Sequence, residues 1–233
     1  MFALLLPFRH NRRLRTSFIV ALVTAFGARI PSAALAATTC PAGAIAGPAV
    51  AARAGEARLQ WIDTHLATTA RRARTWTWGW GTGIVAATGA NLVPLAFVPR
   101  DQRIDWYTGA ATTIVGIVPL LIAPLDVVKD SRELHASIAV PPASDDVCRL
   151  LVDAEARLAR DARNQSDGQR WWLHVGNVIL NSGVGLFLVL GYHHYAAGAL
   201  NAVVGSAIGE AIILTQPTGS IDDLRRYRDG ALD

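Results

Sequence analysis

Four long apolar runs divide the chain, and they come in two pairs. The runs cover residues 76–97 and 107–125 in the first pair and residues 171–190 and 195–214 in the second. Each is close to the roughly 20 residues that a helix needs to cross the hydrocarbon core of a bilayer. The connections within the pairs, residues 98–106 and 191–194, are short. Each pair is therefore predicted to form a hairpin of two transmembrane helices.

Aromatic residues stand at the ends of these runs, where their amphipathic rings favour the membrane interface. The competing interpretation is a soluble protein whose core contains these helices, and polar residues such as Asn91 keep that alternative open. Soluble cores are seldom built from runs this long, so the membrane interpretation is favoured. The rings expected at one interface are Trp76, Trp78, Trp80, Trp171 and Trp172, and those expected at the other are Trp106, Tyr107, Tyr192 and Tyr195.

A charged segment with helical periodicity precedes each pair of runs. In residues 56–74, Leu59, Ile62 and Leu66 share one face, and in residues 145–163, Leu151 and Leu158 do the same. The opposite faces are charged, which is typical of amphipathic helices. These two helices are predicted to pack together or to lie on the membrane surface.

The same order of elements occurs twice along the chain. An amphipathic segment, a tryptophan cluster, two apolar runs and a charged tail occupy residues 50–135 and recur in residues 145–230, with a linker at 136–144 that contains Pro141-Pro142. A shift of 94 places Trp78 on Trp172, and a shift of 89 places Gly109 on Gly198. The expected fold is therefore all-α: an integral membrane helical bundle with four transmembrane helices in two tandem parallel repeats, plus amphipathic extramembrane helices.

The N-terminus has the pattern of a secretory signal. A basic region ends at Arg15, an apolar stretch follows, and Ala34-Leu35-Ala36 forms a small-x-small cleavage site. Residues 1–36 are thus predicted to be a signal peptide, and residues 37–49 a periplasmic segment of the mature chain. An uncleaved signal anchor is the alternative, but Arg29 and Pro31 interrupt a run that is already short for the bilayer.

Charge excludes one large class of function. The net charge of +4 includes five arginines of the predicted signal peptide, and without them 17 basic and 18 acidic residues remain. Nucleic-acid binding requires a basic surface that displaces phosphate counterions, and a near-neutral mature chain has none. The 52% hydrophobic and 17% charged composition instead suits a membrane protein.

Cys40 and Cys148 are the two cysteines of the chain, and both lie outside the apolar runs. In an exported protein, two thiols on one side of the membrane favour a disulfide, although two unpaired buried thiols are the alternative. A removed signal and two crossings per repeat place the mature N-terminus, the amphipathic helices and the C-terminus in the periplasm of a bacterial inner-membrane protein. Counting positive charges favours the inverse orientation, because only Arg100 and Arg103 lie on the other side.

Glu210 is the ionisable residue deepest within an apolar run. An acid inside a membrane is costly, so it is expected to have a hydrogen-bonding partner or a functional role. Antiparallel packing of the last two runs would bring it to the depth of His174, so a hydrogen bond between them is predicted. Asn177 and Asn181 follow His174 at i+3 and i+7 and extend a polar stripe. The stripe serves either as bonding between helices, which we favour, or as a transport or catalytic site.

Small residues are candidates for close helix packing. Gly205 and Gly209 form a small-xxx-small motif, and Gly109 and Gly116 are expected to act similarly in the first repeat. Packing within the chain is favoured over dimerisation. His193 and His194 lack neighbouring carboxylates or cysteines at ligand spacing, so no metal site and no cofactor are predicted. The usual enzyme signatures are also absent from the sequence, which favours a noncatalytic protein.

These features favour a membrane scaffold or accessory subunit, whose periplasmic helices contact a partner while the bundle anchors them in the bilayer. The alternative is a small oligomeric transporter or channel built around Glu210 and His174, and a membrane-embedded enzyme ranks third. A protein partner or a homo-oligomer is compatible with either of the first two functions.

Overall fold

The computed structural model describes residues 39–41, 43, 45–122, 126–139 and 144–232, and all regular secondary structure in these residues is helical. The chain divides into units Met1–Leu35 and Ala36–Asp233, and every described residue belongs to the second. The predicted signal peptide therefore lies outside the described residues. The elements are α1 (Pro48–Ala51), α2 (Gly55–Leu92), the 3-10 turns η1 (Val93–Ala96) and η2 (Arg100–Gln102), α3 (Arg103–Ile122), α4 (Val127–Ile138), α5 (Ser144–Asp167), α6 (Trp171–Tyr192), α7 (Tyr195–Leu214) and α8 (Gly219–Asp229).

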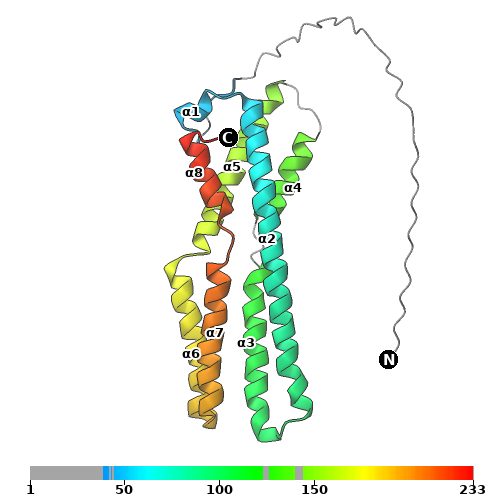
Figure 1. The fold of residues 1–233 in the computed structure, drawn as a ribbon, viewed down its shortest axis with the longest axis vertical. Helices are drawn as coiled ribbons and strands as arrows, with labels where there is room; N and C mark the ends of the chain where they lie inside the picture. The colour runs from blue at the N-terminus through cyan, green and yellow to red at the C-terminus, as the bar shows by residue number, and fades with distance from the viewer. Residues whose placement is uncertain (1–38, 42, 44, 123–125, 140–143, 233) are drawn as a thin grey trace, which may run out of the picture. The chain divides into compact units, whose positions relative to one another are not determined.

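The long helix α2 links two regions of different character (Figure 1). Its first five turns are rich in buried side chains, from Arg58 to Ala73, whereas Ile84 is the one buried residue after that point. We call the first region the head. It consists of the described residues between 39 and 74 together with α4, α5 and α8. The second, the stem, consists of residues 75–122 and 171–214, and includes α3, α6 and α7.

The head is built like a small soluble helical domain. Its core contains the apolar stripes predicted for the two amphipathic helices, with Ile62 and Leu66 of α2 packed against Leu151 and Leu158 of α5, all at most 1% exposed. Each such side chain contributes about 1.5–3 kcal/mol by leaving water. Helix α4 packs on α2 and helix α8 packs on α5, and both close the core at its sides.

The stem consists of two hairpins, α2 with α3 and α6 with α7, which make few contacts with each other. Two stretches of the described residues, Asp146–Tyr192 and Tyr195–Asp229, contain a helix long and apolar enough to cross a membrane; mean hydropathy reaches 1.7 and 1.6 in them. Little of these apolar windows is buried, 17% and 6% respectively. Two of the four predicted spans, α6 and α7, thus meet this criterion.

Some helix boundaries differ from the predicted ones for clear physical reasons. The first amphipathic segment and the first apolar run form one continuous helix, because neither proline nor a capping sequence separates them. Residues 127–133, part of a stretch whose sequence predicts only a charged tail, belong to α4, where Val127 and Leu134 are buried on one face together with Asp130 and Ser131. This helix extends to Ile138 and so includes part of the predicted linker at 136–144.

Candidate functional site

The predicted polar stripe forms one hydrogen-bonded cluster between α6 and α7. His174 Nδ1 lies 2.5 Å from Glu210 Oε2, and Asn177 Nδ2 donates to Glu210 Oε1 at 2.9 Å. Asn177 Nδ2 also lies 2.9 Å from the carbonyl oxygen of Ser206, and Asn181 Nδ2 donates to Asn177 Oδ1 at 2.9 Å. Both carboxylate oxygens of Glu210 therefore have partners. The side chains of His174 and Glu210 remain 31% and 29% exposed at the edge of the hairpin.

The small-residue motif belongs to the same interface as this polar stripe. A Cβ atom at Gly205 would overlap the Asn181 amide, and a Cβ atom at Gly209 would overlap the Asn177 amide. The glycines thus provide the room in which the two asparagines lie. Gly109 plays the same part in the other hairpin, where it faces the Asn91 amide, whereas a Cβ at Gly116 would meet nothing within 4 Å among the described residues.

The backbones of α6 and α7 also approach each other closely nearer the far end of the hairpin. A Cβ atom at Gly185 would lie 2.5 Å from the carbonyl oxygen of Gly198, and one at Gly198 would lie 2.6 Å from that of Gly185. Neither glycine can be replaced without moving a helix. This contact cannot be predicted from the sequence, because a lone glycine in an apolar run carries no signal of its partner.

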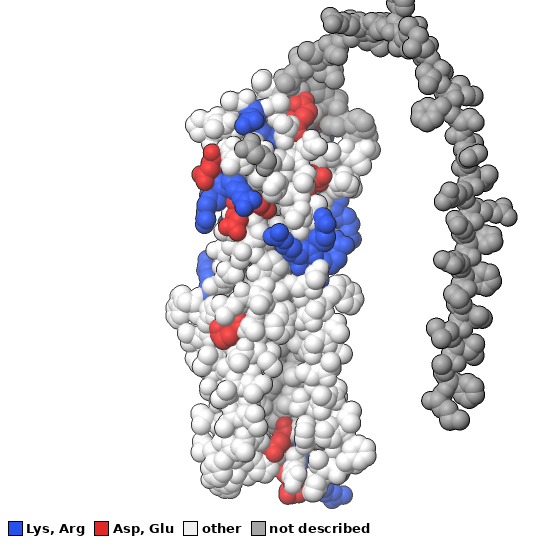
Figure 2. All heavy atoms as spheres, viewed as in Figure 1, with Lys and Arg blue, Asp and Glu red and all other residues white. Residues whose placement is uncertain are grey.

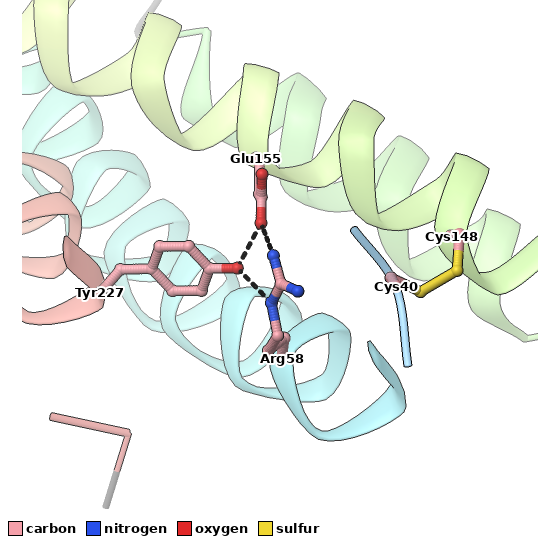
Figure 3. Close-up of a disulfide and its surroundings, with 5 residues drawn as sticks. All are labelled: Cys40, Arg58, Cys148, Glu155 and Tyr227. Atoms are coloured by element: carbon pink, nitrogen blue, oxygen red, sulfur yellow. Dashed lines mark hydrogen bonds and ion pairs between the residues drawn. A yellow bond between two sulfur atoms is a disulfide. The ribbon is translucent and has the colours of Figure 1, made fainter. Parts of the chain in front are cut away.

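The head contains a buried charged triad that sequence reasoning missed (Figure 3). Arg58 of α2 forms an ion pair with Glu155 of α5, and its Nε donates to the Tyr227 hydroxyl of α8 at 3.0 Å. That hydroxyl donates in turn to Glu155 Oε1 at 2.5 Å. Burial, followed by the bond to Glu155, raises the pKa of Tyr227 well above its usual value. The phenol therefore stays neutral and keeps its proton to donate.

The triad ties together three helices from both halves of the sequence. Arg58 and Tyr227 are 0% exposed and Glu155 is 3% exposed, so all three are deep in the core. A signal for the ion pair exists in the sequence. Arg58 is four residues before Ile62, and Glu155 is four after Leu151, so opposite charges occupy core positions on the two amphipathic faces. Only the packing of the helices reveals that these positions meet.

Cys40 and Cys148 form a disulfide beside the triad, as predicted (Figure 3). It joins the segment before α1 to α5 across 108 residues of sequence. Gly43, in the same segment, lies against Glu155, because a Cβ atom at Gly43 would overlap the Glu155 carboxylate. The disulfide thus fixes the segment that covers the buried acid.

A second charged cluster joins α4 to α5. Asp130 accepts from Arg157 at 3.2 Å and from Arg160 at 2.5 Å. Asp161 is 1% exposed, and neither of its carboxylate oxygens has a hydrogen-bond partner among the described residues. Burial first, and then the negative charge of Asp130, raise the pKa of Asp161 to about 8. A proton is therefore held in this interface under mildly acidic conditions.

The two histidines between α6 and α7 have different surroundings. His193 adopts a left-handed backbone conformation (φ 59°) at the end of α6 and is exposed. His194 Nδ1 lies 2.6 Å from Asp105 Oδ1, which links this turn to the beginning of α3. Within the part of the chain that the structure describes, no three histidine, cysteine or acidic side chains are grouped closely enough to hold a metal ion.

Comparison of the chain with models of known protein families, with characterised proteins and with solved structures finds no match. Its function therefore has to be inferred from the chemistry of its own residues.

Proposed function

We propose that this protein is a multi-pass membrane anchor with four transmembrane helices, whose head is held outside the lipid to contact a partner protein. One observation carries the proposal: the large hydrophobic side chains exposed among the described residues lie on the stem, with Val152 the single exception in the head. All four stem helices take part, as the exposed fractions of Val85 (60%), Ile114 (51%), Ile179 (66%) and Val203 (69%) illustrate.

Such a surface is unfavourable in water and neutral in lipid. Exposed apolar area costs about 25 cal/mol for each Å² that could otherwise be buried, and monomeric soluble proteins seldom expose large apolar patches. The charged residues are distributed in a complementary way, mostly outside this apolar surface. Figure 2 shows Lys, Arg, Asp and Glu gathered on the head and again at the far end of the stem, with few between. The stem helices α2 and α3, although less apolar than α6 and α7, share this exposed apolar surface.

Tandem duplication of the two hairpins is supported by the positions at which their helices approach. The shift of 94 that aligns the tryptophans places Asn91 on Gly185, and the shift of 89 places Gly109 on Gly198. Asn91 faces Gly109 in one hairpin, and Gly185 faces Gly198 in the other. In both hairpins, corresponding positions thus lie where the two helices approach each other closely. In the head, α4 packs on α2 as α8 packs on α5.

A periplasmic head in a bacterial inner membrane is favoured by the disulfide. Disulfides persist in oxidising compartments and are rare where cellular reductants act. Cys40 and Cys148 both belong to the head, and each hairpin returns the chain to that side. By the positive-inside rule, the basic residues of the head favour a cytoplasmic head. Their effect is smaller than their number suggests, because many are paired with acids, as Arg157 is with Asp130, Glu133 and Asp153.

Extraction of membranes tests the anchor. Alkaline carbonate releases proteins held by polar contacts and leaves transmembrane proteins in the pellet. We expect the full chain to remain in the pellet after the wash and to dissolve only in detergent. A chain found in the carbonate supernatant would refute the membrane position and, with it, the proposed function.

A scaffold also needs a partner, and Val152 offers a probe for it. Its side chain is 57% exposed on α5. We expect a photo-crosslinking amino acid at Val152 to capture a protein that also copurifies in stoichiometric amount, and V152D to abolish that copurification while the amount of anchored protein is unchanged. The same crosslinker at the exposed Arg132 of α4 is the control. Purification as a single species from gently solubilised membranes would contradict a scaffold.

A second candidate, an oligomeric transporter or channel, is favoured by the partial exposure of the His174–Glu210 pair. An ionisable group on a lipid-facing edge is costly, and a second copy of the chain could cover it and complete a polar path. Reconstitution in liposomes containing a pH-sensitive dye tests this function. Proton flux above that of empty liposomes that is lost in E210Q, but kept in the head variant E133Q, would support it. Flux equal to that of empty liposomes would exclude proton transport.

A further inference from the structure

Three arginines and two tryptophans lie together on α2 where the head meets the stem, and we call them the collar: Arg71, Arg72, Arg74, Trp76 and Trp78. The three arginines are exposed, directly beside the last buried position of the head, Ala73. None of them is within ion-pair distance of a carboxylate among the described residues, in contrast to Arg157, which contacts three acids. The collar therefore holds positive charge that no acidic side chain in the described part of the chain neutralises.

Two open hollows adjoin the collar. One, of about 470 Å³, is lined by Arg71, Arg72, Thr75, Trp76, Thr215 and Pro217. The other, of about 490 Å³, is lined by Arg71, Arg74, Thr75, Trp78 and Gly79. Each is lined by two arginines, a threonine and a tryptophan, and most of the lining surface is apolar. A ligand that fits must combine an anionic group with an apolar portion.

The walls of the first hollow are held in place by hydrogen bonds. Thr215, at the end of α7, accepts from Trp76 Nε1 at 3.1 Å and from Trp80 Nε1 at 3.0 Å. These bonds join α2 to α7 and set the depth of the indoles. Trp78 lies on another face of the helix and is 72% exposed. Indoles favour the level of lipid headgroups, so the arginines lie at the depth of lipid phosphates.

We propose that the collar binds the phosphate headgroups of anionic phospholipids; this rests on the membrane position proposed above. Guanidinium groups bind phosphate oxygens in a planar, bidentate geometry, and an interfacial site lets the acyl chains lie on the apolar surface beyond Trp78. A free phosphate ion shares the charge but not the chains. Bound lipids would screen the collar and fix the depth of the head above the bilayer.

Native mass spectrometry of the full chain in detergent, titrated with phosphatidylglycerol or phosphatidylcholine, tests the site. We expect phosphatidylglycerol to bind at least about 10-fold more tightly than phosphatidylcholine. Because each interfacial arginine contributes about fivefold to binding of anionic lipid, R71Q/R72Q/R74Q should weaken phosphatidylglycerol binding by roughly 100-fold. Glutamine suits an exposed helix position, so the variant is expected to fold, and its circular dichroism is compared with that of the wild type.

The matched control is R132Q/R149Q/R225Q, which removes the same charge from exposed positions of the head. It should bind phosphatidylglycerol as the wild type does. Equal losses in the two triple variants, or equal binding of the two lipids by the wild type, would overturn the site. Inorganic phosphate that displaces the lipid at equal concentration would show a free-anion site and overturn it as well. A chain that shows no lipid preference yet stays in the carbonate pellet would leave the anchor standing, whereas release by carbonate would remove both proposals.

Discussion

Asp161 brings an ionisable group into the interface between α4 and α5, where it makes stability depend on pH. The charged and titratable neighbours that act on it are Asp130 and Asp126 from the α4 side and Arg160 from α5. The folded-state pKa is about 8, against about 3.9 for an unfolded aspartate. Between these values the folded protein holds a proton that the unfolded chain has released. The free energy of unfolding therefore falls as pH rises from about 4 to about 8.

Replacing Asp161 with Asn should remove this dependence. We expect the free energy of unfolding of D161N to rise relative to that of the wild type from pH 5 to pH 8, by at most about 1.4 kcal/mol per pH unit, and its melting temperature to rise in step. Thermal unfolding followed by circular dichroism at each pH measures it. The control D146N, at the other end of α5, where the side chain is 47% exposed, should keep the wild-type profile. Parallel profiles for D161N and the wild type would mean that Asp161 is ionised in the folded state.

The Arg58–Glu155 pair should reveal the cost of an unpaired buried charge. Removing one member leaves the other without its counterion in the core, which typically costs 3–5 kcal/mol, about the same for either member. We expect R58M and E155M each to be strongly destabilised, and the double variant to be more stable than either single one. Chemical unfolding of the purified chain measures all three. A double variant destabilised by the sum of the two single effects would show that the pair is not coupled.

At the scale of elements, the hairpin of α6 and α7 should depend on which glycine is enlarged. Leucine at position 185 would collide with the Gly198 backbone and with Ala202, so G185L should separate the helices and lower stability by about 1–3 kcal/mol or more. Position 183 is the control, because a Cβ atom there would meet nothing within 4 Å. Detergent unfolding curves compare them. Equal stability of G185L and G183L would contradict the close approach.

The same hairpin should show coupling between its polar residues. His174 and Glu210 share a hydrogen bond, so E210Q and H174A should have strongly non-additive effects on the free energy of unfolding. The control combines E210Q with H193A, because His193 lies at the far end of α6. That pair should be additive. Additivity in the His174–Glu210 cycle would refute the contact as a stabilising one.

Features of this architecture can be predicted from the sequence where the residues of a single segment determine them. Long apolar runs predict α6 and α7, and periodic Leu and Ile predict the faces of α2 and α5 that form the head core. The pairing of Cys40 with Cys148 follows from there being two cysteines in the chain and from the predicted export to an oxidising compartment. The sequence predicts α4 only as a charged tail, because this helix is short and rich in charge and its apolar residues make their contacts across the head.

The contacts that depend on tertiary register are those that sequence reasoning missed. The triad requires Arg58, Glu155 and Tyr227 to lie at the same level when α2, α5 and α8 pack together. The spacing of residues within one segment does not determine this. The collar arginines were assigned simply to a charged face, because whether an arginine has an acidic partner depends on what packs beside it. Burial in the assembled head decides both cases.

For the whole molecule, the orientation of the head is the prediction with the widest consequence. In the proposed orientation with four crossings, Cys40 and Cys148 would face the periplasm, and the connection at Arg100 between α2 and α3 would face the cytoplasm. We expect an impermeant maleimide to label both native cysteines in intact spheroplasts after reduction. In a C40S/C148S background, R100C should be labelled only after the membrane is permeabilised. The reverse pattern would place the head in the cytoplasm, where cellular reductants oppose the disulfide. Most basic residues of the mature chain would then lie on the cytoplasmic side, as the positive-inside rule favours.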